Sequence, residues 1–134
     1  MLEKDCIQTR GFRNTYQDGH PDGFQLKIRS LYYRGLWLSQ IRSMFLIVDE
    51  EVYSKDQINW QIDGRVYTLD EMLGEGDVHW GVTRPAVLLV KKPGGLQNGT
   101  HHVKFGFLFS SSYLPLVLDE VLSYGDHEKD LILV

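Results

Sequence analysis

The chain has 134 residues, of which 43% are hydrophobic and 24% are charged, a composition typical of a globular protein and consistent with one domain over residues 1–134. Its formal net charge is −4 and its basic residues do not cluster, which argues against a nucleic-acid partner. Cys6 is the only cysteine, which excludes an internal disulfide. No apolar run reaches the length of a membrane span and no signal peptide is visible, so we expect a cytoplasmic protein with no membrane association.

The first predicted elements are antiparallel strands. In residues 24–29 apolar and polar side chains alternate, which is the pattern of a strand with one buried face. A run rich in turn-forming residues, 17–23, precedes this strand, and we expect residues 7–12 to form the partner strand before that turn.

A two-residue hairpin is predicted in the middle of the chain. Asp63-Gly64 lies between two apolar-polar alternating runs, 58–62 and 65–69. Both turn positions of such a hairpin favour a positive φ, which aspartate and glycine accept readily.

Only one short helix is indicated. Residues 68–71 match a capping box, in which Thr68 and Glu71 satisfy each other's backbone N–H groups, and Gly74 ends the helix soon afterwards. Residues 114–122 fit either a strand or a helix. Short strands with frequent turns and at most one short helix predict an all-β protein, an antiparallel β-sandwich.

Asn98-Gly99 is a second hairpin signal, placed between the predicted strands 87–92 and 102–109. Two adjacent histidines, His101 and His102, open the second of these strands.

Neighbouring side chains of a strand point to opposite faces, so these two imidazoles cannot bind one ion together. We expect His101 to share a face with the apolar residues of 103–109 and His102 to point the other way. No further ligand lies nearby at metal spacing, so a strand-edge position is favoured over a metal or catalytic role.

Three segments would have apolar side chains on both faces of a strand: 44–48, 86–90 and the C-terminal run 131–134. A sandwich strand with one solvated face should alternate instead. Each segment could be a central strand covered by loops, but the three together favour an exposed surface that a partner covers.

The aromatic stretch 31–38 supports the same interpretation. Its residues Tyr32, Tyr33, Arg34 and Trp37 are of the types that anchor protein interfaces. We therefore take these four as candidate contacts to a partner or a substrate, with burial in the core as the alternative.

Five stretches occur in an order and spacing that are similar to a known family. They are GFR at 11–13, GFQLKIR at 23–29, YYRG at 32–35, GRVYTLDEM at 64–72 and VKKPGGL at 90–96. Together they resemble the small β subunit of bacterial C-glycoside deglycosidases over roughly residues 1–115. The role of the tail, 116–134, is left open.

The resemblance implies a β-sandwich that works in a complex. A larger α subunit with a sugar-isomerase-like (β/α) barrel would carry a divalent metal, Mn²⁺, and the acid–base residues, and the pairs would assemble into a higher hetero-oligomer. The complex would cleave the carbon–carbon bond between a 3-oxo-glucosyl group and an aromatic aglycone of the flavonoid type. This chain would be the non-catalytic subunit, with no cofactor or catalytic residue of its own, and the substrate would lie at or near the interface.

Two other functions compete with this one. A stand-alone carbohydrate-binding module would use the rings of Tyr33, Trp37, Trp60 or Trp80 as stacking platforms. A small sandwich enzyme would use His101 or His102 and would bind metal in the isolated chain.

Overall fold

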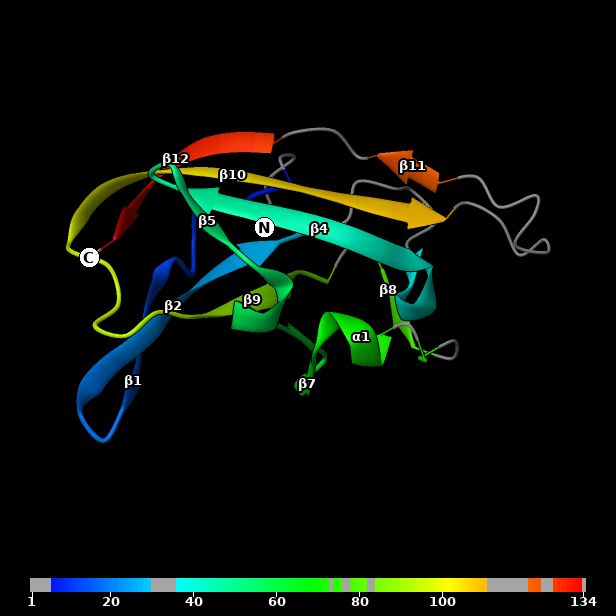
Figure 1. The fold of residues 1–134 in the computed structure, drawn as a ribbon, viewed down its shortest axis with the longest axis horizontal. Helices are drawn as coiled ribbons and strands as arrows, with labels where there is room; N and C mark the ends of the chain where they lie inside the picture. Colours follow the sequence, from blue (N-terminus) through cyan, green and yellow to red (C-terminus); the bar gives the residue numbers. More distant parts are fainter. Residues whose placement is uncertain are drawn as a thin grey trace.

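The computed structural model describes residues 6–29, 36–72, 74–75, 78–81, 84–110, 121–123 and 127–133. Two antiparallel β-sheets lie one above the other and enclose the hydrophobic core (Figure 1). The prediction of an antiparallel β-sandwich with at most one short helix is confirmed for these residues. In the same residues, no helix is both long and apolar enough to cross a membrane.

The first sheet has the strand order β1-β2-β9-β6-β7. Its strands are β1 (Arg13–Gln17), β2 (His20–Ile28), β9 (Ala86–Lys91), β6 (Ile58–Ile62) and β7 (Arg65–Tyr67). The second sheet has the order β11-β10-β4-β5, and β12 also pairs with β10. Its strands are β11 (Val121–Ser123), β10 (Gly99–Ser110), β4 (Ile41–Val48), β5 (Glu51–Tyr53) and β12 (His127–Leu133).

Smaller elements complete the described chain. Strands β3 (Leu36–Trp37) and β8 (His79–Trp80) form a two-stranded pair. The helical elements are η1 (Leu38–Gln40), η2 (Lys55–Gln57) and the single α-helix of the described residues, α1 (Leu69–Met72).

Alternation along the strands builds the core between the sheets. Phe24, Leu26 and Ile28 of β2 are fully buried, as the pattern of residues 24–29 predicts. From the other sheet, Phe105 lies 6.2 Å from Trp60, measured between ring centroids. These buried aromatic rings join the two layers, because each removes a large apolar area from water.

The predicted partner of β2 is wrong. Asp18 and Gly19 alone form the turn, with φ of 52° and 80°, and β1 pairs with β2 directly across it. Residues 20–23 therefore belong to the strand despite their turn-like composition, and Ile7 makes only an isolated bridge to Ile28. A two-residue turn with both φ values positive closes the hairpin early, so the partner strand lies nearer in sequence than expected.

The hairpin at Asp63-Gly64 is confirmed, with φ of 52° and 83° and the flanking strands β6 and β7 in register. The hairpin expected at Asn98-Gly99 is wrong, because β9 and β10 belong to different sheets. Strands β2 and β6 flank β9, whereas β4 and β12 flank β10, so neither strand has a free edge for the other.

The segment between β9 and β10 is held to the β1–β2 hairpin instead. The N–H of Gly94 donates to the Pro21 carbonyl, and Asn14 bonds both the N–H and the carbonyl of Leu96. These hydrogen bonds hold the segment against the first sheet before the chain enters β10 of the second sheet.

The short helix begins at its predicted capping box. The Thr68 hydroxyl accepts a hydrogen bond of 3.1 Å from the Glu71 N–H, and the Glu71 carboxylate accepts one of 3.0 Å from the Thr68 N–H. The N–H of Gly74 then donates to the Glu71 carbonyl, where the helix ends. The helix closes one end of the core with Leu69 and Met72.

Candidate functional site

The two adjacent histidines lie on opposite faces of β10, as the sequence predicts. His101 is 9% exposed and points into the sandwich together with Val103 and Phe105, whereas the side chain of His102 is 46% exposed on the outer face. The pair therefore divides into a core residue and a surface residue. On one side His101 and His102 pair with β12, whereas on the other side the pairing with β4 begins only at Val103, next to the turn at Asp49.

Both ring nitrogens of the buried His101 face hydrogen-bond acceptors. Nδ1 lies 2.5 Å from a carboxylate oxygen of Asp49, and Nε2 lies 2.7 Å from the carbonyl oxygen of Gln97. A neutral imidazole has only one N–H, so satisfying both acceptors requires the charged ring. Burial by itself would lower the pKa of His101, but the bonds to Gln97 and Asp49 raise it above its ordinary value.

Asp49 fixes the turn between β4 and β5 onto β10. Its carboxylate also accepts a 2.9 Å hydrogen bond from the His102 N–H, and its own N–H donates to the His102 carbonyl at 2.9 Å. Burial alone would raise the pKa of Asp49, but the bonds from His101 and His102 lower it below its ordinary value. We call the group His101, Asp49 and Gln97 the histidine clamp.

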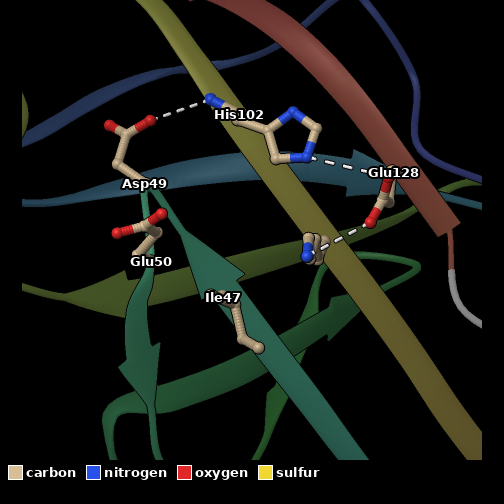
Figure 2. A pocket seen from close by; sticks show the side chains of 6 residues that line it. Ile47, Asp49, Glu50, His102 and Glu128 are labelled. Carbon is tan, nitrogen blue, oxygen red and sulfur yellow. Dashed lines mark hydrogen bonds and ion pairs between the residues drawn. The ribbon is translucent and has the colours of Figure 1, made fainter.

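An open hollow lies on the outer face of the second sheet, beside this clamp (Figure 2). Its volume is about 490 Å³, and it is lined by Ile47, Asp49, Glu50, His102, Lys104 and Glu128. The residues come from β4, the β4–β5 turn, β10 and β12, which are neighbouring strands.

The β10–β12 side of the hollow carries paired charges. Nδ1 of His102 lies 2.7 Å from Asp130, and its Nε2 lies 3.8 Å from Glu128. The ammonium of Lys104 lies 3.3 Å from the other oxygen of Glu128. All four side chains are about half-exposed or more, so these pairs organise the surface more than they stabilise the fold.

The β4–β5 side of the same face is apolar. Ile47 stands directly opposite Val52 of β5 and opposite Lys104 of β10. Val52 is 67% exposed, and Phe45 is half-buried opposite the buried Gly106. We call Phe45, Ile47 and Val52 the apolar stripe.

In each of the three apolar segments, alternate residues are therefore buried in the core and the residues between them lie on the outer face of a sheet. Segments 44–48 and 86–90 are central strands, as one of the two interpretations holds, yet Val87 and Leu89 stay half-buried on the outer face of the first sheet. In the C-terminal run, residues 131–133 belong to β12 and pair with β10, and Leu131 and Leu133 are buried. Only Ile132, 65% exposed, points outward from it.

Of the four candidate contact residues, the structure describes one. Tyr32, Tyr33 and Arg34 lie outside the described residues. Trp37 is half-buried on β3, and its ring meets the ring of His79 edge-on at a centroid distance of 5.0 Å. It lies on the two-stranded pair β3–β8, apart from the hollow, and its role as a contact residue stays a prediction.

We expect Trp37→Ala to weaken association with a partner or the affinity for a substrate while the fold is kept, since the indole is only half-buried. Trp60→Ala is the matched control, because the same ring is removed from a fully buried position and the fold should be lost first. Thermal melting and a binding titration of both variants check this. A collapsed melting transition in Trp37→Ala would assign that residue to the core.

Two of the proposed sugar-stacking platforms are excluded by burial. Trp60 and Trp80 are both 0% exposed, and their ring N–H groups are satisfied internally by the Met44 sulfur and the Arg84 carbonyl. A ring that stacks on a sugar must offer one face to solvent. The carbohydrate-binding hypothesis therefore loses these two residues.

Within the described ranges, no three His, Cys, Asp or Glu side chains are grouped so that they could hold a metal ion. The expectation that this chain has no cofactor of its own stays a prediction.

The sequence patterns did not indicate Asp49 and Glu50 as site residues. Asp49 lies 52 residues before His101, so no local pattern connects them. The apolar character of residues 44–48 was the available signal that this face is unusual.

Comparison with known proteins agrees with the motif resemblance. The model of the C-glycoside deglycosidase beta subunit family matches residues 2–113. The C-glycoside deglycosidase beta subunit of Eubacterium cellulosolvens is 50% identical over 122 residues, which make up 90% of this chain and 83% of that protein. The protein of the same name from Arthrobacter globiformis is 24% identical over 71 residues, 52% of this chain and 54% of that protein. The chain therefore belongs to the C-glycoside deglycosidase beta subunit family.

Proposed function

We propose that this chain is the non-catalytic β subunit of a cytoplasmic C-glycoside deglycosidase complex. The observation that carries the proposal is the 50% identity to a protein named C-glycoside deglycosidase beta subunit, over 90% of this chain. The α subunit, a sugar-isomerase-like (β/α) barrel, holds a divalent metal and the acid–base residues. The β subunit shapes the mouth of that barrel, with the substrate at or near the interface, and the pairs assemble into a higher hetero-oligomer.

The proposed reaction is an elimination that breaks the bond between the sugar and its aromatic aglycone. The ketone of the 3-oxo-glucosyl group acidifies the neighbouring C2–H, from which a base removes the proton. The electron pair of that bond forms the C1=C2 double bond, the C1–aryl bond breaks, and the aryl carbon takes up a proton. The reaction is therefore a carbon–carbon lyase step that consumes no water.

The outer face of the second sheet supports the role of a subunit. A half-exposed apolar stripe with Val52 at 67% exposure is unusual on a solvated sheet face. Charged side chains border it on one side, as at protein interfaces with an apolar centre and a polar rim.

Co-expression with the α subunit encoded in the same genome tests this function. We expect both chains to elute together from gel filtration at a constant ratio. Release of the aglycone from a 3-oxo-C-glucoside should occur with the complex and not with this chain alone. Metal analysis should find a stoichiometric divalent ion in the complex and none in the isolated chain.

Separate, well-behaved elution of the two chains would count against the proposal. A stoichiometric metal ion in the isolated chain would instead favour the small sandwich enzyme that uses His101 or His102.

A further inference from the structure

We infer that the outer face of the second sheet, over β5, β4 and β10, is the surface on which the partner subunit docks, and that the partner presents apolar side chains bordered by arginine or lysine. This inference rests on the proposed function, because it assumes that a partner subunit exists. It adds which of the two outer faces is used and what chemistry the partner must offer.

The geometry of one row of side chains across the sheet is the first step. Val52, Ile47, Lys104 and Glu128 stand opposite one another on adjacent strands and point away from the core. The row changes from aliphatic on β5 and β4 to charged on β10 and β12. A surface of this kind has an apolar part and a polar border already in place.

The charge of this face indicates which side chains the partner subunit presents to it. The carboxylates around the hollow and at its border are those of Asp49, Glu50, Glu128 and Asp130. They outnumber the cationic groups beside them, which are the Lys104 ammonium, the His102 imidazole and the His101 ring that pairs with Asp49. A partner surface that approaches this face therefore gains from basic side chains and loses from acidic ones.

The hollow also fits the shape of a long basic side chain. Ile47 offers an aliphatic wall for the methylene stem, while Glu50 and Glu128 lie on two sides of the opening (Figure 2). Arginine and lysine bury their stems on apolar surface and keep the charged head among polar groups. Arginine is the better match, because its planar guanidinium can bind two carboxylates at once.

The opposite outer face supplies a matched control. Strand β5 has the sequence Glu-Val-Tyr and strand β7 has Arg-Val-Tyr, and each is a three-residue edge strand that ends in a buried tyrosine. Val52 and Val66 are the central residues of these strands, 67% and 49% exposed. A valine-to-lysine substitution at position 52 and one at position 66 are therefore alike except for the sheet face that each alters.

The experiment measures binding of the co-expressed α subunit to wild-type, Val52→Lys and Val66→Lys chains. We expect Val52→Lys to weaken the complex about tenfold or more, because it buries an unpaired charge in the apolar centre of the interface. Val66→Lys should leave the affinity unchanged within about twofold, since exposed surface substitutions have small effects. Thermal melting of both variants should match the wild type, which separates docking from folding.

A second pair of variants tests the charge argument. Glu50→Gln removes one carboxylate at the hollow, and Asp18→Asn removes one from the β1–β2 turn, where φ is also positive. We expect Glu50→Gln alone to slow association and to reduce its dependence on salt concentration.

The outcomes separate this inference from the proposed function. If the wild-type chain forms no complex, the proposed function fails. If the wild-type complex forms and both lysine variants bind equally, this inference is wrong and the proposed function stands. The inference would also be wrong if Val52→Lys abolished self-association of the chain and left binding of the α subunit unchanged. In that case a second copy of this chain would bind the face.

Discussion

Phe105→Ala is expected to lower the free energy of unfolding by about 3–5 kcal/mol. The ring is 0% exposed and packs between the sheets, with its centroid 5.8 Å from that of Phe107 and 6.2 Å from that of Trp60. Strands β4 and β12 flank β10 at this point and have little freedom to close a cavity. The loss should therefore include the cavity left behind as well as the lost burial of the ring.

Urea unfolding of the purified chain measures this, with the midpoint lowered and the slope unchanged. Phe45→Ala is the control, since the same side chain is removed from the half-buried outer face of the same sheet. It should cost about half as much or less. Equal losses for the two variants would contradict the assignment of Phe105 to the core and Phe45 to the surface.

His101→Gln is expected to lower the free energy of unfolding by about 2 kcal/mol below neutral pH. The charged ring donates hydrogen bonds to the Asp49 carboxylate and the Gln97 carbonyl, and it holds the β4–β5 turn and the chain before β10 together. Glutamine cannot carry this charge. Asp49 is half-exposed, so solvent screening keeps the loss near the lower end for such bonds.

The pH dependence has a definite sign. The pKa of His101 is raised in the folded protein, so its contribution to stability is complete below the ordinary value of 6.5 and is lost as the pH rises through the raised pKa. The pKa of Asp49 is lowered, so its contribution is present above 3.8 and is lost as the pH falls through the lowered value. The clamp should therefore be strongest between these limits.

Unfolding curves at several pH values from about 6 to about 9 should show wild-type stability falling as the pH rises, and a flatter profile for His101→Gln. His102→Gln serves as the control, because its exposed ring only pairs with Asp130 and Glu128 on the surface. It should keep the fall in stability with rising pH that the wild type shows. Parallel profiles for the wild type and His101→Gln would show that the clamp carries no charge.

Features that depend on neighbouring residues could be predicted from the sequence. The alternation in 24–28, the Asp63-Gly64 turn and the capping box at Thr68 each involve a few consecutive residues whose chemistry decides the local structure. The opposite orientations of His101 and His102 follow from strand geometry in the same way.

Pairings between distant strands could not be predicted. Asn98-Gly99 has the composition of a hairpin turn, but the strands beside it find their partners elsewhere, and that choice depends on which sheet edges are already filled. The sequence predicts Gly23 in a turn, whereas it lies in β2 at a close approach to β9. A β-carbon there would collide with the Val90 carbonyl oxygen. The glycine is needed for strand contact and not for chain reversal.

The candidate site shows the same division. The apolar run 44–48 indicated an unusual surface, and the exposed Val52 beside Ile47 supports that reading. The hollow, in contrast, combines residues from β4, β10 and β12, and its lining could not be assembled before the register of these strands was known.

The turn between β4 and β5 has an unfavourable backbone. Asp49 and Glu50 have φ of 50° and 71°, whereas the turns at Asp18-Gly19 and Asp63-Gly64 have glycine in the second place. A long side chain in this conformation costs about 1 kcal/mol. Directed evolution for heat resistance alone would therefore favour glycine at position 50. The more heat-resistant protein would have lost the Glu50 carboxylate that lies at the mouth of the hollow.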